Sequence, residues 1–318
     1  MKMDAITGAQ AKHGQTKTAK WVTHFSKNKY LYALLLPGTI YLLIFDYIPL
    51  AGLVLAFKDF SPGDSFFGGE WVGLKWFNEF FNSIYFFRLL KNTILLHLYD
   101  LLWGFPIPIV FALLLHELRR QYFKRFVQTV SYFPHFISTV IIAGLIVNFL
   151  SPTDGIITRL IHALTGSETN LLGDQGWFRT IYVISNVWAS FGWNSIIYLA
   201  ALTAVDVHLY EAADMEGAGR WKKMTSITLP SIMPTIVTLL ILNMGKLLSV
   251  GYEKIILLYN PGTYETADVI STYVYRRGLL GADYSFGVAV GLFNSVASFL
   301  ILILINYISK RVNNVSLW

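Results

Sequence analysis

The sequence predicts an all-α protein that crosses a membrane six times. Of its 318 residues, 54% are hydrophobic, 16% are aromatic and only 14% are charged. The mean hydropathy of +0.51 is unusual for a soluble domain. Six apolar segments each approach the ~20 residues that a helix needs to cross hydrocarbon. These observations predict a polytopic membrane protein with six transmembrane helices.

The apolar segments follow one another without an internal repeat. They run approximately over residues 31–57, 92–115, 128–150, 180–204, 231–250 and 286–308. The first is too long for the apolar region of a signal peptide and lacks a plain small-residue cleavage site, so we expect an uncleaved span. We therefore predict a single membrane domain over residues 30–318, preceded by a basic cytoplasmic tail over residues 1–29. The first 20 residues of that tail are polar and expected to be disordered.

The distribution of Lys and Arg predicts how the spans are oriented. Fifteen of the 25 basic residues lie in the tail, the loop after the second span, the segment after the fourth span and the C-terminus. They are Lys2, Lys12, Lys17, Lys20, Lys27, Lys29, Arg119, Arg120, Lys124, Arg125, Arg220, Lys222, Lys223, Lys310 and Arg311. Because short cytoplasmic loops carry excess positive charge, both termini are expected in the cytoplasm. The net charge of +6 reflects this topology, and nucleic acid is not an expected partner.

Residues 211–234, EAADMEGAGRWKKMTSITLPSIMP, form a polar segment between the fourth and fifth spans. Asp206 is positioned to cap a short helix, Gly217 and Gly219 to end it, and Pro230 to restart the chain. Small side chains leave one side of this helix smooth, and acidic side chains face water or a partner. The small residues are Ala212, Ala213 and Ala218, and the acidic residues are Glu211, Asp214 and Glu216. The pattern predicts a docking element, with an ordinary cytoplasmic loop as the alternative.

The spacing within this segment resembles the EAA loop of ATP-binding-cassette (ABC) import permeases. Glu211, Ala212 and Ala213 are followed by three residues and Gly217, then by nine residues, Ile227, one residue, Leu229 and Pro230. Two positions depart from the usual pattern, because Glu216 replaces Asp and Met224 stands where Phe is common. Neither departure changes the pattern of charge. The resemblance implies the fold of a type I ABC importer permease.

The same resemblance implies how the loop is used. In that family the EAA helix lies at the cytoplasmic face, in a groove of an ATPase subunit. A cytoplasmic coupling loop is therefore implied over residues 205–230. The residues implied to couple to the ATPase are Glu211, Ala212, Ala213, Asp214, Glu216, Gly217 and Ala218.

Further segments resemble the permeases of bacterial complex-carbohydrate importers, which are related to maltose-type importers. They are LLLPGTIYLLIFDYIPLAGLVLAFKDF, NTILLHLYDLLWGFPIPIVFALLLHELRR, QTVSYFPHFISTVIIAGL and GYEKIILLYNPGTYETADVISTYVYRRGL. That branch moves oligosaccharides, including fragments of plant polysaccharides, across the bacterial cytoplasmic membrane. The implied partners are a second homologous permease in a heterodimer, an ABC ATPase dimer, an extracytoplasmic sugar-binding protein, the oligosaccharide and membrane lipid.

The chain carries no nucleotide-binding signature of its own. The nearest candidate, GAGRWKKMTS from Gly217, lacks the Gly-Lys-Ser/Thr ending of a phosphate-binding loop. We expect no catalytic residue, no metal and no cofactor on this chain, with ATP and Mg²⁺ bound by the partner ATPase subunits. The lack of cysteine excludes thiolate metal sites. A set of Ser, His and Asp residues suggests an intramembrane hydrolase, but no catalytic motif frames it. Its members are Asp46, His97, Asp100, His135 and Ser138.

Candidate sugar contacts lie on the fourth and fifth spans. Carbohydrate sites combine aromatic faces with amides and charges that satisfy hydroxyl groups. The fourth span supplies both types within thirteen residues, in Asn186, Trp188, Trp193, Asn194 and Tyr198. In maltose-type importers, contacts come from the spans just before and just after the EAA loop. The resemblance assigns Asn186, Trp188 and Trp193 on the fourth span, with Lys246 and Val250 on the fifth. For each aromatic side chain, an interfacial belt or helix packing is the alternative.

Lys246 is an unusual residue for a membrane span. A buried ammonium group costs at least ~2.5 kcal/mol at the bilayer centre unless it is paired or faces water. One hypothesis is that Lys246 lines a cavity and meets the carboxylate of an acidic sugar such as a uronate. The alternative is that it extends to the outer interface or pairs with Glu253, and the sequence leaves both open.

We expect an alternating-access mechanism. A loaded binding protein docks outside on the loops 58–91 and 251–285, while closure of the ATPase dimer is transmitted through residues 207–222. The rival function is a self-sufficient secondary sugar transporter, which needs an intramembrane carboxylate relay or discontinuous helices. Only Asp46 and Asp100 offer such carboxylates, both near the ends of spans.

Overall fold

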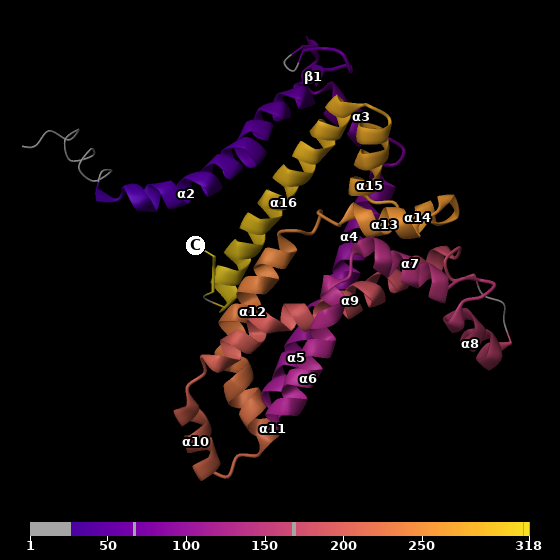
Figure 1. The fold of residues 1–318 in the computed structure, drawn as a ribbon. Coiled ribbons are helices and arrows are strands. Elements are labelled where there is room, and N and C mark those ends of the chain that lie inside the picture. The colour runs from indigo at the N-terminus through magenta and orange to yellow at the C-terminus, as the bar shows by residue number, and fades with distance from the viewer. Residues whose placement is uncertain (1–26, 66–67, 167–169, 314, 318) are drawn as a thin grey trace, which may run out of the picture. The chain divides into compact units, whose positions relative to one another are not determined.

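The computed structural model describes residues 27–65, 68–166, 170–313 and 315–317 (Figure 1). Most of the predicted basic tail, residues 1–26, lies outside the described residues. The chain divides into two compact units, Met1–Val54 and Leu55–Trp318. The described parts of both units are built mainly from helices, as the sequence predicts.

The described part of the first unit forms most of one long apolar helical run. α2 (Lys29–Leu42) continues into a π-helical turn, η1 (Leu43–Tyr47), and a 3₁₀ segment, η2 (Ile48–Phe57). The run is 29 residues long, which is enough to cross a membrane. Its large apolar side chains are exposed, and Leu34 reaches 85%. Such a surface requires lipid or another protein chain around it.

The second unit contains the other long helices. They are α4 (Phe86–Gly104), α5 (Pro106–His116), α9 (Gln175–Thr203), α12 (Leu229–Met244) and α16 (Tyr284–Asn313). Among the described residues, four helical runs are long and apolar enough to cross a membrane by themselves, and two bent helix pairs bring the number to six. The four are Lys29–Phe57, Phe86–His116, Arg220–Met244 and Tyr284–Val312. The architecture agrees with the six predicted spans.

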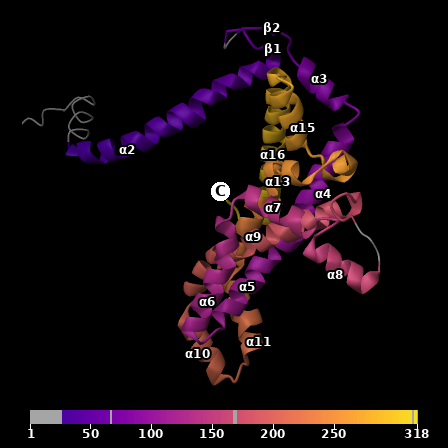
Figure 2. The same cartoon turned by 45° about the vertical axis from the view of Figure 1, so that its right-hand side comes forward.

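α9 organises the packing of the second unit. α4 and α5 pack along it, and α6 (Gln121–Tyr132) and α12 contact it as well (Figure 2). Gly192 allows α6 to approach closely, because a Cβ atom there would overlap the backbone carbonyl of Ser131. One apolar core joins α5, α9 and α12, through Ile109, Ala112, Leu113, Tyr198, Leu202, Ile232 and Ile236. A second core joins α4, α7 (Thr139–Phe149), α9 and α13 (Tyr252–Leu258).

The third predicted span, residues 128–150, is broken and not continuous. α6 runs into a 3₁₀ turn, η3 (Phe133–Phe136), and α7 leaves at 96° to the α6–η3 segment. Pro134 cannot donate a backbone hydrogen bond. Ser138 then caps α7, where its hydroxyl accepts a hydrogen bond from the Ile141 N–H at 3.4 Å. The break has a local cause, although the apolar pattern runs straight through it.

The fifth predicted span, residues 231–250, ends early. α12 stops before Gly245, and the chain continues in turns, in which the Lys246 N–H donates to the Asn243 carbonyl at 2.9 Å. Placing Lys246 and Val250 on this helix was therefore wrong. Glycine is a poor helix former, and hydrogen bonds between residues three apart have replaced the helical pattern at this point.

Short elements make up the connections of the second unit. Near one end lie β1 (Lys58–Asp59) and β2 (Glu70–Trp71), which pair antiparallel, with α3 (Lys75–Phe81), α15 (Ile270–Val274) and η6 (Tyr275–Leu280). The opposite end holds α10 (Val207–Met215), α11 (Arg220–Lys223) and η4 (Met224–Thr228) (Figure 1). The remaining elements are α8 (Ile156–Thr165), η5 (Pro261–Thr263) and α14 (Tyr264–Ala267).

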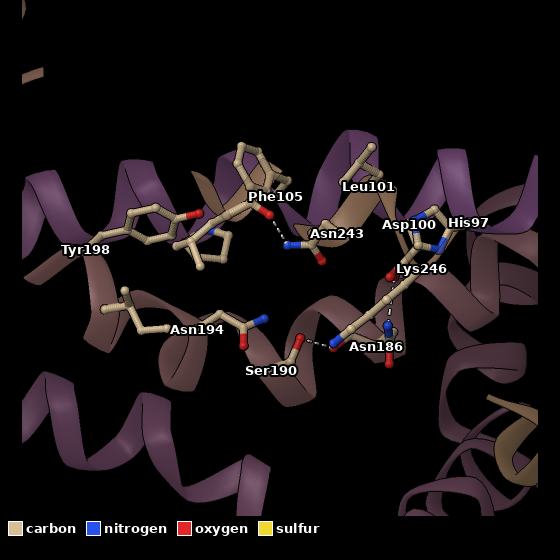
Figure 3. A pocket seen from close by; sticks show the side chains of 14 residues that line it. His97, Asp100, Leu101, Phe105, Asn186, Ser190, Asn194, Tyr198, Asn243 and Lys246 are labelled. Carbon is tan, nitrogen blue, oxygen red and sulfur yellow. Dashed lines mark hydrogen bonds between the residues drawn. The ribbon is translucent and has the colours of Figure 1, made fainter. Parts of the chain in front are cut away.

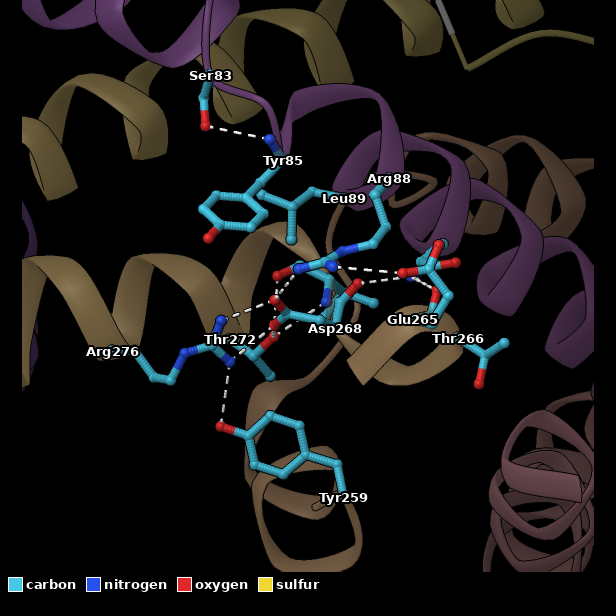
Figure 4. Close-up of polar contacts among 12 residues, drawn as sticks. Ser83, Tyr85, Arg88, Leu89, Tyr259, Glu265, Thr266, Asp268, Thr272 and Arg276 are labelled. Carbon is cyan, nitrogen blue, oxygen red and sulfur yellow. Dashed lines mark hydrogen bonds and ion pairs between the residues drawn. The ribbon is translucent and has the colours of Figure 1, made fainter. Parts of the chain in front are cut away.

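A buried carboxylate ties the segment after α14 to α4 (Figure 4). Asp268 has no exposed surface, and its two oxygens accept hydrogen bonds from Arg276 at 2.8 and 2.7 Å. Thr272 donates to the same carboxylate at 2.7 Å, Arg88 of α4 approaches it at 3.6 Å, and the Asn92 amide donates to the Asp268 carbonyl at 3.0 Å. Burial lowers the pKa of Arg276, but its hydrogen bonds to Asp268 outweigh burial and leave that pKa raised. We call these five residues the Asp268 network.

Candidate functional site

The segment predicted to couple to a partner forms a short capped helix. α10 meets α9 at 70°, and Asp206 caps it by accepting a hydrogen bond from the His208 N–H at 2.9 Å. At the other end Gly217 has φ +73°, the left-handed conformation that glycine adopts readily. Gly219, which was also expected to end the helix, has φ −69° and instead precedes α11. We call residues 205–230 the coupling loop.

Much of the coupling loop surface is unpacked. Lys223 pairs with Asp214 at 2.6 Å, which links α11 to α10. Met215 is 90% exposed and Trp221 is 74% exposed, although both side chains are apolar. Of the seven predicted coupling residues, Ala213 and Ala218 are partly buried and the other five are exposed. A polar loop that also exposes large apolar side chains is suited to contact another protein.

A cavity of about 370 Å³ lies between α4, α5, α9 and α12 (Figure 3). Its polar lining residues are His97, Asp100, Asn186, Ser190, Asn194, Tyr198, Asn243 and Lys246. The Asn186 amide donates to the Asp100 carboxylate at 2.8 Å. Lys246 extends across the cavity toward Ser190 (Figure 3). Amides, hydroxyls and opposite charges around a space of this size can bind a ligand rich in hydroxyl groups.

The two tryptophans predicted as sugar contacts do not line this cavity. Trp188 lies two residues from Asn186 on α9, and side chains at that spacing do not share a helix face. It lines a separate apolar pocket with Trp103. Trp193 stacks on His135, with ring centroids 4.5 Å apart and an interplanar angle of 7°. That contact fits the packing alternative, because η3 presents His135 to α9 where the third span breaks.

The other predicted substrate residues separate in the same way. Asn186 and Lys246 line the cavity, whereas Val250 is buried in the apolar core beside α13, and its carbonyl accepts a hydrogen bond from the Ser271 hydroxyl at 2.7 Å. The structure therefore brings together two of the five predicted substrate residues. Ser190 was missed, although its position four residues after Asn186 on a helix was a usable signal.

Four of the residues considered for an intramembrane hydrolase belong to the second unit, and they are not assembled into one site. Ser138 caps α7, and His135 stacks on Trp193. His97 and Asp100 line the cavity, three residues apart on α4. The arrangement provides no hydroxyl nucleophile activated by a histidine among these residues.

Comparison with known proteins places the chain in a family. Residues 104–314 match the family described as binding-protein-dependent transport system inner membrane component. The chain belongs to this family. The permease is thus a multi-pass membrane protein, and the resemblance to ABC import permeases inferred from the EAA spacing is confirmed.

The permease is similar to two proteins of Bacillus subtilis (strain 168). It is 44% identical to protein LplB over 93% of each chain. It is 46% identical to the polygalacturonan/rhamnogalacturonan transport system permease protein YteP, over 90% of this chain and 89% of that one. It also superposes on a chain of a bacterial alginate ABC transporter crystallised in complex with an alginate pentasaccharide-bound periplasmic protein. The TM-score is 0.84 at 44% sequence identity, over 93% of this chain and 99% of that chain.

Proposed function

We propose that the permease is one of two transmembrane subunits of an ATP-driven importer for an acidic oligosaccharide. The observation that carries this proposal is the cavity, in which Lys246 faces the amide of Asn186 and the hydroxyl of Ser190. An ammonium group forms strong charge-assisted hydrogen bonds with a carboxylate, and amides and hydroxyls satisfy sugar hydroxyl groups. The named substrates of the polygalacturonan permease and the alginate transporter are polymers of acidic sugars, which supports the same class here.

The coupling loop is the proposed contact with the ATPase. The loop presents Glu211 and Gly217 at the surface, close to the exposed Met215. We infer that the loop, both termini and the basic segments lie in the cytoplasm, and that the outer end receives the loaded binding protein. ATP and Mg²⁺ are held by the ATPase dimer, so this chain contributes no catalytic group. Trp188, Trp193 and Val250 stay predictions of the resemblance, outside the cavity that Asn186 and Lys246 share.

Two observations favour the rival function of a secondary transporter. Asp100 lines the cavity, and α6 and α7 form a broken helix, which are two features that ion-coupled carriers use. The two functions differ in their need for ATP and for other subunits.

Purification of the tagged permease in mild detergent distinguishes them. Co-purifying chains are identified, and ATP hydrolysis is measured with a binding protein that is empty, loaded with oligogalacturonate, or loaded with a neutral oligosaccharide. We expect a second permease and an ATPase, with hydrolysis stimulated most by the acid-loaded binding protein. A lone chain that moves the sugar into liposomes without ATP contradicts the proposal.

A further inference from the structure

We infer that Lys254 sets the preference for acidic substrates by balancing the charge of Asp100 from behind the cavity wall. Lys246 then presents a positive charge that no lining carboxylate cancels. This inference rests on the proposed function and adds a positioning residue to it. Lys254 itself lies outside the lining of the cavity.

The charge of Asp100 opposes the binding of an acidic sugar in this cavity. Its carboxylate lines the same cavity as Lys246, and its hydrogen bond with Asn186 fixes it there at 2.8 Å. A second carboxylate brought close by an acidic sugar is repelled unless the first is compensated. Among the described lining residues other than His97, the charges of Asp100 and Lys246 cancel. The lining by itself therefore carries no net charge.

Lys254 is placed to supply the compensation. It lies on α13 with 8% of its surface exposed, and its Nζ atom is 3.4 Å from the Tyr182 carbonyl and 5.1 Å from the centroid of that ring. α13 packs in the apolar core that contains Leu96, one helical turn before Asp100 on α4. Tyr182 lies one turn before Asn186 on α9, and Asn186 donates to the Asp100 carboxylate at 2.8 Å, so Lys254 reaches the turn of α9 beside the Asp100 carboxylate. The opposite charges of Lys254 and Asp100 attract each other across this turn. Because Lys254 is buried, water and salt screen its charge less than they screen an exposed charge.

The arrangement also explains how a buried lysine is stabilised at this position. A buried ammonium is unfavourable unless it meets oxygen acceptors, aromatic faces or an opposite charge. For Lys254, the Tyr182 carbonyl is the oxygen acceptor, the Tyr182 ring is the aromatic face and Asp100 is the opposite charge. Together with Lys246, it leaves the cavity region with one positive charge in excess.

The test uses the assembled transporter in proteoliposomes, with an oligogalacturonate and its methyl ester as acidic and neutral probes. Lys254→Met should raise the KM for the acid about tenfold and leave that for the ester unchanged, since only the acid meets the uncompensated Asp100. Lys254→Arg should behave like the parent. Adding Asp100→Asn to Lys254→Met should restore the KM for the acid, because asparagine keeps an acceptor for Asn186 without the charge.

A second measurement applies if Lys254→Met does not assemble. Asp100→Asn alone should then lower the KM for the acid about threefold relative to that for the ester, because two cations remain without a carboxylate. The inference is overturned if each variant changes the KM for the acid and the KM for the ester by the same factor. If the parent transporter takes up the acid only without ATP, or takes up neither probe, the proposed function fails instead.

Discussion

The two ends of the second unit are stabilised in opposite ways. At one end the Asp268 network buries a carboxylate completely between Arg88 and Arg276. At the other end the coupling loop relies on helix caps and on the pair between Lys223 and Asp214, whose carboxylate side chain is 61% exposed. The first end therefore holds a fully buried carboxylate, whereas the ion pair at the second lies largely at the surface. Both ends expose large apolar side chains, such as Leu280 and Met215.

This difference indicates which end the chain stabilises more strongly by its own ion pairs. Removing one partner from a buried ion pair costs about 3–5 kcal/mol, because an uncompensated charge stays buried. A surface pair contributes about 0–1 kcal/mol. The Asp268 network therefore stabilises its end of the permease more strongly than the Lys223–Asp214 pair stabilises the coupling loop. A more weakly held loop suits the part that we propose transmits movement.

Asp268→Asn is expected to have the largest effect. The substitution keeps the shape of the side chain but leaves Arg88 and Arg276 without their buried counter-charge. We expect a loss of about 3–5 kcal/mol of stability. Thermal unfolding in detergent, followed by tryptophan fluorescence, measures it. The matched control is Asp59→Asn, which removes the exposed partner of Lys75 and should leave the melting temperature unchanged. Equal shifts in the two variants would remove the contrast between the two ends.

Gly217→Asp tests the coupling loop. No atom lies within 4 Å of the position a Cβ would occupy, so the altered loop should fold, with only the moderate strain of a left-handed aspartate. The new carboxylate changes the surface offered to the ATPase. We expect an assembled complex whose stimulation by loaded binding protein falls more than about fivefold, in the range of typical coupling energies. Glu211→Lys should act similarly. Normal stimulation in a well-assembled complex counts against the docking role.

Lys246→Met tests the cavity between the two ends. It removes the cation proposed to meet the substrate but alters neither the Asp268 network nor the coupling loop. The KM for an acidic oligosaccharide should rise about tenfold, while that for a neutral one should stay unchanged. Uptake into proteoliposomes measures both values. A similar change for both sugars would show that Lys246 does not recognise the carboxylate.

Lys223→Met should have the smallest effect. It removes the exposed ion pair with Asp214, which contributes less than about 1 kcal/mol. The isolated permease should therefore keep its melting temperature within a few degrees, in contrast to Asp268→Asn. A loss as large as that of Asp268→Asn would mean that the coupling loop is internally stabilised after all.

The fold could be predicted from the sequence where one dominant pattern was sufficient. Long apolar segments gave the spans, and the spacing from Glu211 to Pro230 located a capped helix with Gly217 at its end. The apolar pattern did not predict where a helix bends or ends when a single proline, serine or glycine interrupts an apolar segment. The third span bends between Pro134 and Ser138, although the segments on both sides of the bend are apolar. The helix of the fifth span ends at Met244, before Gly245 and Lys246.

The candidate site could be predicted less completely. Asn186 and Lys246 were assigned by the resemblance, and Lys246 was also noticed because a charged side chain is rare in an apolar segment. Trp188 and Trp193 are of a residue type that is common in sugar-binding sites. What each of them contacts depends on how the helices pack, which the sequence alone does not show. The role of Lys254 depends on α13 folding back onto the core beside α4, which no spacing along the chain reveals.

Uptake by proteoliposomes containing the purified complex tests the central claim most directly. Labelled oligogalacturonate is presented by the binding protein outside, with ATP, or a non-hydrolysable analogue, enclosed inside. We predict uptake that requires both hydrolysable ATP and the binding protein, and that is lost with Gly217→Asp. Uptake by this permease alone, driven by an ion gradient and indifferent to ATP, would contradict the account and establish a secondary transporter.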